Sequence, residues 1–439
     1  MSATAADFYR DEFVRVDAFL PGRRLPWLRR VRELALAYFA DTGFPTLRQE
    51  DWKYTSVAMI EKSRFALAAP DVDSITPRQI GGWSLPGTLR LVFVNGHYRP
   101  GLSSVGDLPA GVTLTGLAEQ LECAPERVEA LLGAAPAAYA SGFAALNAAF
   151  MTDGAYVELA DGAALDAPVE LLFVATGPDL AAHTRNLVVA GAGSRISLIE
   201  HHVAAGEGAY FSNTVTGIVV GHDAEVVHHK LQQESRKAFH IAAVQADLQG
   251  GSRLTSRSFA LGGGLVRVDI GVGLNAERAA CTLDGLYMID GRQHVDHHTR
   301  IDHARPLCTS RELYKGVLAG ASRAVFNGKV IVHADAQHSD AYQANRNLLL
   351  SDNAEVDSKP QLEIYADDVK CSHGATVGQL DPEQVFYLRS RGVDDASARA
   401  LLTFAFAEEV VERVDIEPLR ARLETLLMGQ LPERVKELL

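Results

Sequence analysis

The chain has 439 residues, 47% of them hydrophobic, and a formal net charge of −13 at pH 7. This length is enough for a large core and two or three domains. The acidic balance argues against a nucleic-acid-binding protein, which needs basic surface to neutralise phosphates, and it is typical of a soluble cytoplasmic protein. The sequence has no run of about 18 apolar residues that would predict a membrane span, and its N-terminal residues do not read as a signal peptide.

The cysteines are scattered, and no two of them form a Cys-x-x-Cys pair. They therefore predict neither a disulfide framework nor a zinc or cluster site contained in one chain, and they suit a reducing compartment. Their positions are Cys123, Cys281, Cys308 and Cys371.

Three regions follow one another along the chain. Residues 1–80 are expected to form a helical domain, because residues 25–43 carry apolar side chains at roughly helical spacing. Residues 81–380 are expected to be a β domain, in which 81–165 could form a mixed entry segment. Residues 381–439 are again expected to be helical, with helices beginning after Asp381 and near residues 395 and 417.

The β region contains short β-branched runs broken by Gly, Asp and Asn, which indicates an all-β architecture. A weak repeat recurs there: a small or acidic residue, then a charged residue, then an apolar one. A roughly regular spacing of 20–50 residues predicts a solenoid, and without one helix per repeat a β-helix fits best. A two-sheet sandwich remains the alternative. The triplets are 194–196, 224–226, 252–254, 277–279, 322–324 and 354–356.

The stretch Lys359–Asp381 carries the most distinctive chemistry. Cys371 and His373 lie two residues apart, so in a strand they point to one face and could bind one iron, zinc or sulfur species. Lys370 is expected to favour the thiolate. Iron–sulfur clusters usually need about four ligands, so this pair would be half a site, completed by another chain. A buried cysteine beside a histidine at a strand end is the structural alternative.

A second candidate lies at residues 294–303. In a strand, His294, Asp296 and His298 share one face and could bind a divalent metal on the surface. A polar outer strand face is the simpler interpretation. Two adjacent pairs, His201-His202 and His228-His229, point to opposite faces and are therefore poor bidentate ligands.

The sequence motifs that are typical of common enzyme classes are missing or weak. The sequence lacks a Gly-x-Ser-x-Gly elbow, a phosphate-binding loop and a dinucleotide-binding motif. Asp335, Asp340, Asp367 and Asp368 could serve a β-helix carbohydrate enzyme, but adjacent carboxylates on a strand face opposite ways and make a poor acid/base pair.

The segment Ser310–Gly392 resembles the core signature of the SufB/SufD family, whose members are scaffold subunits for iron–sulfur cluster assembly. Gly43–Thr55 and Leu91–Tyr98 are also similar to that family. Two departures favour the SufD branch: no cysteine precedes Cys123, and Gly374 follows His373 where SufB-type chains tend to have Glu.

The resemblance implies a mainly β fold, a right-handed parallel β-helix flanked by N-terminal and C-terminal α-helical domains. It also implies a scaffold subunit without catalytic activity, in a complex with a SufB-like paralogue and a SufC-like ATPase. The isolated chain is expected to bind no cofactor and to be able to form a homodimer. In the complex a transient iron–sulfur cluster is expected, and association of a flavin is left open.

Carried over to this sequence, the resemblance implies that His373 is an iron or nascent-cluster ligand shared with the partner chain, with Cys371 second. Docking of the SufC-like ATPase is expected on residues 405–414, around Phe404, Phe406, Glu408 and Glu409. A stand-alone homodimeric metal-binding protein that uses the histidines of residues 294–298 remains an alternative.

Overall fold

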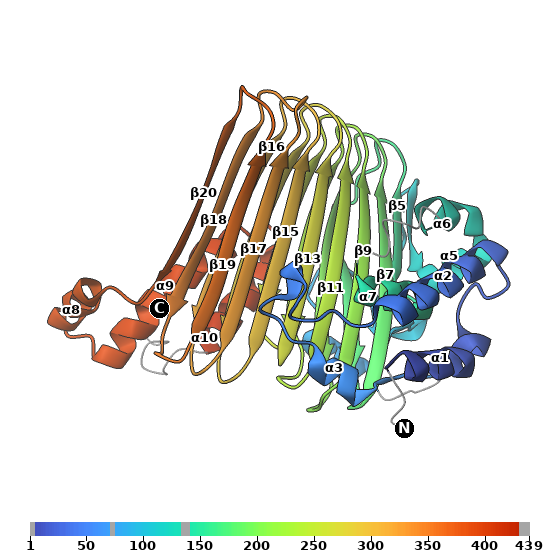
Figure 1. The fold of residues 1–439 in the computed structure, drawn as a ribbon, viewed down its shortest axis with the longest axis horizontal. Coiled ribbons are helices and arrows are strands. Elements are labelled where there is room, and N and C mark those ends of the chain that lie inside the picture. The colour runs from blue at the N-terminus through green and yellow to red at the C-terminus, as the bar shows by residue number, and fades with distance from the viewer. Residues whose placement is uncertain (1–4, 71–74, 133–140, 430–439) are drawn as a thin grey trace.

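The computed structural model describes residues 5–70, 75–132 and 141–429. Its central part is a parallel β-helix built from two ten-stranded sheets, with helices at both ends of the chain. Figure 1 shows the strands side by side across the molecule, with the N-terminal helices toward one end and the C-terminal helices toward the other. The predicted fold class is confirmed. The domain boundaries near residues 80 and 380 stay predictions.

Sheet A contains the strands that pair in the order β19-β17-β15-β13-β11-β9-β7-β5-β4, with β1 beside β7. Their bounds are β1 Ala66–Leu67, β4 Val112–Gly116, β5 Ala155–Leu159, β7 Leu180–Ala190, β9 Phe211–Val220, β11 Phe239–Leu248, β13 Leu265–Leu274, β15 His294–His303, β17 Arg323–Val332 and β19 Glu355–Ile364.

Sheet B pairs in the order β20-β18-β16-β14-β12-β10-β8-β6-β2-β3. Its strands are β2 Leu89–Val94, β3 His97–Tyr98, β6 Val169–Ala175, β8 Arg195–Ala204, β10 Glu225–Gln233, β12 Arg253–Ala260, β14 Ala280–Ile289, β16 Thr309–Leu318, β18 Asp340–Leu349 and β20 Lys370–Gly378.

From β5 onward the chain alternates between the two sheets, so each coil adds one strand to each sheet. The strands of neighbouring coils pair in parallel and in register: Glu225 of β10 aligns with Arg195 of β8 and with Arg253 of β12. These residues are the charged centres of the repeated triplets, which therefore mark strand starts. One triplet is displaced, because Arg278 lies in a turn with φ 61° and the register partner of Arg253 is Ala280.

The core lies between the two sheets. Alternate residues of both sheets, such as Val226 and Leu254 of sheet B and Val244 and Val268 of sheet A, belong to one buried apolar cluster. The period-2 alternation of strand side chains explains this arrangement, since every second residue points inward.

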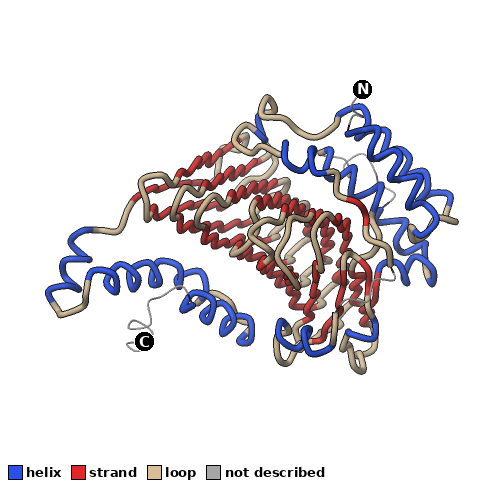
Figure 2. Tube along the Cα trace, turned by 90° about the horizontal axis from the view of Figure 1, so that it is seen from below, coloured by secondary structure: helices blue, strands red, loops and turns tan. Residues whose placement is uncertain are grey.

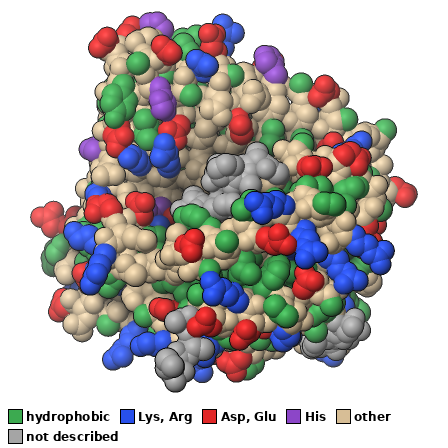
Figure 3. All heavy atoms as spheres, turned by 45° about the vertical axis from the view of Figure 1, so that its right-hand side comes forward, with side chains coloured by type: hydrophobic (Ala, Val, Ile, Leu, Met, Phe, Trp, Pro, Cys, Tyr) green, Lys and Arg blue, Asp and Glu red, His purple; other side chains and the backbone are tan. Residues whose placement is uncertain are grey.

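Most of the N-terminal helices cover the outer face of sheet A, whereas Ile80 of the helix Pro77–Trp83 lies in a cluster with Val92 and Leu172 of sheet B. Phe143 and Phe150 of α7 pack with Tyr9 and Phe39 against Phe211 of β9 in a second buried cluster. The helices are α1 Ala5–Val16, α2 Pro26–Thr42, α3 Ala58–Ser63, α4 Pro77–Trp83, α5 Leu117–Cys123, α6 Pro125–Leu132 and α7 Gly142–Phe150. On the face seen in Figure 3, acidic and basic side chains are interspersed, so no continuous basic stripe crosses it.

The C-terminal helices pack on the outer face of sheet B, where Val410 and Leu419 join a cluster with Ile199, Leu231 and Phe259. Figure 2 shows the two helical groups on opposite sides of the β-helix. The helices are α8 Pro382–Ser390, α9 Asp395–Val411 and α10 Glu417–Gly429. The Asp381 carboxylate accepts a 2.8 Å hydrogen bond from the Glu383 amide, as the predicted N-cap requires. In the described part of the chain, none of the helices is long and apolar enough to cross a membrane.

Candidate functional site

Cys371 and His373 lie on β20, the last strand of sheet B. Their register partners on β18 are Ala341 and Gln343, which are buried in the β-helix. The pair therefore occupies inward-facing positions of the last coil, where Cys371 is half-buried against the core and His373 is exposed. The prediction that the two residues share one face is confirmed.

The thiol of Cys371 is not activated in this chain by itself. Burial raises the pKa of Cys371 above its ordinary value, and the negative charge of Asp340 adds to this effect. The raised pKa runs against the expectation that Lys370 favours the thiolate, and Lys370 itself is exposed to solvent. A metal ion bound here would have to displace the proton of the thiol.

Cys371 and His373 belong to no group of three metal-ligating side chains among the described residues. The one such group there is His202, Glu234 and His240, and it lies on other coils. Two ligands do not complete a cluster site. The interpretation of Cys371 and His373 as half a site stays a prediction.

Behind His373 the inward positions are polar. Glu312 of β16, Gln343 of β18 and His373 of β20 share one register position across three coils. The Gln343 amide donates a 2.5 Å hydrogen bond to Glu312, and burial raises the pKa of that carboxyl group to about 7. Sequence reasoning missed Glu312 and Gln343, because only the coil register places them in line with His373.

The last coil leaves one edge of each sheet unpaired. Among the described strands, β19 pairs only with β17, and β20 only with β18. Ile364, Tyr365 and Val377 expose large side chains at this end. A free strand edge with exposed apolar residues is a template for a further strand from another chain.

The histidines of β15 are arranged differently from the surface metal site considered above. Asp296 is fully buried, accepts hydrogen bonds from Arg267 and Thr55, and lies 3.0 Å from His298 Nε2. His294 Nε2 contacts the Thr55 hydroxyl at 2.9 Å. Burial alone would raise the pKa of Asp296, but Arg267 and His298 hold it well below its usual value. This network anchors the N-terminal segment to sheet A, and metal binding there stays a prediction.

The acidic residues considered for carbohydrate chemistry lie at exposed corners of the β-helix. Asp340 pairs with Arg311 at 2.9 Å, and Asp368 lies 3.0 Å from His338 Nδ1. Asp340 and Asp368 thus contact different basic residues, which does not favour a shared acid/base site.

The four residues expected to dock the ATPase lie on α9, and two of them contact this chain's own β-helix. The Lys315 ammonium donates to the Phe406 carbonyl at 2.8 Å and pairs with the Glu409 carboxylate. Phe404 lines a groove between α9 and the β-helix. Glu408 has one buried oxygen without a hydrogen bond, and burial raises the pKa of its carboxyl group.

Two aromatic residues that sequence reasoning did not single out are more exposed. Phe386 and Tyr387 of α8 are 72% and 58% accessible. The sequence did contain a signal for this exposure. Phe386 and Tyr387 are adjacent on a short helix, and one helix face cannot bury two adjacent residues.

Comparison with known proteins identifies the family. Residues 173–406 match the model of the "SUF system FeS cluster assembly, SufBD core domain", and residues 3–171 match the "SufBD protein N-terminal region". The chain belongs to the SufBD family. The iron–sulfur cluster assembly protein SufD of Escherichia coli (strain K12) is 34% identical over 396 residues, which cover 89% of this chain and 90% of its own.

Other SufBD relatives are similar over comparable lengths. An iron–sulfur cluster assembly SufBD family protein of Synechocystis sp. is 33% identical, covering 93% of this chain and 92% of its own. Protein ABCI7, chloroplastic, of Arabidopsis thaliana is 30% identical, covering 94% and 87%. The resemblance inferred from the residues is thereby confirmed: this is a SufD-family iron–sulfur cluster assembly protein.

Proposed function

We propose that the chain is a non-catalytic scaffold subunit that shares a nascent iron–sulfur cluster, or its iron, with a SufB-like paralogue. The observation that carries the proposal is the position of Cys371 and His373 on inward-facing positions of the last coil, beside an unpaired sheet edge. Neutral imidazole is a competent iron ligand, so His373 is the leading residue and Cys371 the second.

Ligand counting supports a partner chain. The pair supplies two ligands, whereas clusters are usually held by about four. Because β19 and β20 end the two sheets, a paralogue with the same coil could continue them and place its own ligands opposite His373. A second copy of this chain could use the same edge, which would give a homodimer in isolation.

The C-terminal helices would carry the ATPase. α8 presents Phe386 and Tyr387 to solvent, while α9 is attached to β16 through Lys315. Movement of a SufC-like ATPase bound to these helices could therefore reach the β-helix through Lys315. Loss of ATPase binding in a pull-down after deletion of residues 393–439 is the expected result, and retained binding would contradict this assignment.

In this proposal the cluster is cargo that leaves the complex, and catalysis of ATP hydrolysis belongs to the partner. Whether a flavin joins the complex stays open. The predicted cytoplasmic location also stays a prediction, since one relative carries "chloroplastic" in its name.

The test uses the co-purified complex of this chain with its SufB-like and SufC-like partners. His373→Ala should lower the iron and acid-labile sulfide bound per complex, whereas His222→Ala should not, because His222 is exposed and pairs with Asp223 at a distant corner. If the intact complex with His373→Ala bound as much iron and sulfide as the wild type, His373 would not be a ligand of the iron or cluster.

A further inference from the structure

Three ligating side chains meet inside the β-helix, several coils away from Cys371. His202 comes from β8 of sheet B, His240 from β11 of sheet A, and Glu234 from the turn that joins β10 to β11. One ligand atom of each residue lies within 4.8 Å of the others. Their exposed fractions are 1%, 0% and 6%, so the group is buried at the corner where the two sheets meet.

The surrounding residues fix the orientation of this group. The His202 ring stacks on Phe173, with centroids 4.6 Å apart and planes 12° apart. The amide of Gln232 donates a 3.1 Å hydrogen bond to Glu234. The His202 and His240 rings meet edge to face, with centroids 4.7 Å apart. Supported ligands of this kind lose little freedom when they bind an ion.

His240 lacks the partner that a buried imidazole normally has. Glu234 Oε2 lies 2.7 Å from His240 Nδ1, but neither ring nitrogen of His240 makes a hydrogen bond of acceptable geometry. Buried polar groups are almost always satisfied, and an ion is one of the ordinary explanations for an exception. Two ligand atoms that lie this close without a well-formed hydrogen bond suit two ligands of one ion.

The charges in this part of the interior also leave room for a cation. The Lys230 ammonium donates 2.9 Å hydrogen bonds to Glu200 and to His202 Nε2, and its charge is balanced by Glu200. A neutral imidazole has one lone pair, so an ion that takes His202 as a ligand displaces the Lys230 hydrogen bond to this ring. Glu234 has no lysine or arginine partner among the residues that the structure describes. A carboxylate buried in the interior beside two imidazole rings is costly unless a positive charge balances it.

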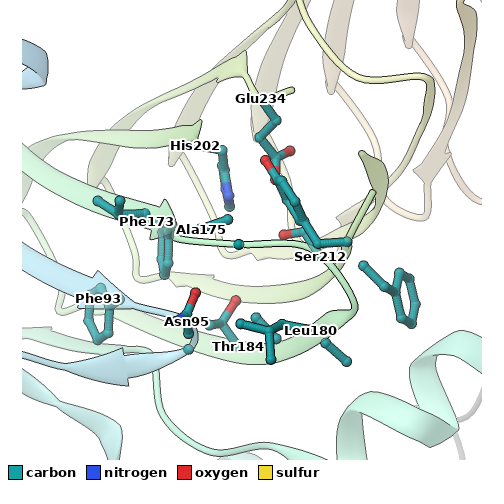
Figure 4. A pocket seen from close by; sticks show the side chains of 16 residues that line it. Phe93, Asn95, Phe173, Ala175, Leu180, Thr184, His202, Ser212 and Glu234 are labelled. Atoms are coloured by element: carbon teal, nitrogen blue, oxygen red, sulfur yellow. The ribbon is translucent and has the colours of Figure 1, made fainter. Parts of the chain in front are cut away.

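A small cavity of about 30 Å³ is lined by His202 and Glu234. Figure 4 shows His202 and Glu234 on one side of the cavity, with Phe93 and Asn95 across from them. The volume is enough for a water-sized group beside these two side chains.

We propose that His202, Glu234 and His240 form a binding site for one divalent transition-metal ion of the Zn²⁺ or Fe²⁺ class inside the β-helix. Two histidines and one carboxylate are a common donor set for these ions and leave open positions for water. Bonds of about 2.0–2.2 Å would draw the three ligand atoms closer together, by small side-chain rotations. The site is independent of the cluster half-site, because every ligand comes from this chain.

The experiment uses the purified full-length chain alone, stripped with a chelator and titrated with Co²⁺ as a spectroscopic substitute for Zn²⁺. The expected result is one equivalent of Co²⁺ with visible absorption bands, which Zn²⁺ then abolishes. Glu234→Gln and His240→Gln, which keep similar volumes, should each weaken Co²⁺ binding at least about 10-fold to 100-fold with an unchanged circular dichroism spectrum.

Two control variants locate the ion. His222→Ala and His333→Ala remove exposed histidines that pair with Asp223 and Asp302, and both should retain full Co²⁺ binding. The proposal would be overturned if the wild-type chain bound no Co²⁺ at about 1 mM, or if binding survived both Glu234→Gln and His240→Gln. Since His373→Ala tests the proposed function separately, failure of either proposal leaves the other one standing.

Discussion

The side-chain amide of Gln343 donates a 2.5 Å hydrogen bond to the buried carboxyl group of Glu312, one coil behind His373. Glu312 has no basic partner among the ion pairs of the described residues, and burial raises its pKa from 4.5 to about 7. Because this pKa is higher in the folded chain than in the unfolded chain, the protonated Glu312 carboxyl group contributes stability. That contribution is fully present below about pH 4.5 and is lost as the pH rises through about 7.

Glu312→Gln should therefore stabilise the chain at pH 8, by up to about 3 kcal/mol, and change it little at pH 4.5. The neutral amide replaces a carboxylate that is costly to bury and keeps the contact with Gln343. Urea unfolding at the two pH values measures the difference. The exposed Glu355→Gln should show no such pH dependence, and an equal shift in both variants would contradict this account.

Cys371 should react slowly with iodoacetamide at pH 7.5 in the isolated chain, because burial raises its pKa above the ordinary 9.0. Its labelling rate should rise steeply only at higher pH, while the exposed Cys123 reports the reactivity of an accessible thiol. Peptide mass spectrometry measures both sites in one sample. Lys370→Ala should leave the Cys371 rate nearly unchanged, and a several-fold fall would restore the lysine as the activating group.

Arg267 joins β13 to the N-terminal segment: its guanidinium carbon lies 3.7 Å from the Trp52 ring centroid, and it forms a 2.7 Å ion pair with buried Asp296. Arg267→Met should lower the free energy of unfolding by about 3–5 kcal/mol, because it leaves Asp296 buried without its cation. Denaturant unfolding measures the loss. Arg300→Met is the matched control on neighbouring β15; Arg300 is mostly exposed and pairs with Asp302, so little change is expected. Equal effects would refute the role of burial.

Lys315 should hold α9 on sheet B. Its ammonium reaches the Phe406 carbonyl and Glu409, and it lies 4.2 Å from the Phe406 ring centroid. Lys315→Met should destabilise the chain by about 1–3 kcal/mol and speed proteolysis between α8 and α9. Arg346→Met removes a more exposed cation 3.5 Å from the same Glu409 and should do less. If proteolysis is unchanged by Lys315→Met, this contact does not hold the helix.

Some features of the site could be predicted because they are local. The period-2 geometry of a strand puts Cys371 and His373 on one face whatever the rest of the chain does. The repeated triplets marked strand starts for the same reason, since Arg195, Glu225 and Arg253 each open a strand. The triplet at Arg278 does not mark a strand start, because Arg278 lies in a turn and the strand begins at Ala280.

Other features are non-local, and the sequence alone does not show them. Because His201 and His202 are adjacent in a strand, the sequence predicted that they cannot bind one ion together. The fold instead brings His202 close to Glu234, from the turn after β10, and to His240, from β11 of the other sheet. Trp52 and Arg267 are far apart in the chain and meet only because the N-terminal segment crosses sheet A.

The sequence by itself determined the family, the β-helix and the position of Cys371 and His373 on one strand face. These features depend on residues that are close together in the chain, through strand alternation and family motifs. The tertiary structure alone decided that the Cys371 thiol is half-buried with a raised pKa and that the interior gathers His202, Glu234 and His240. Burial and coil register set both results, and each depends on residues from separate coils rather than on spacing along the chain.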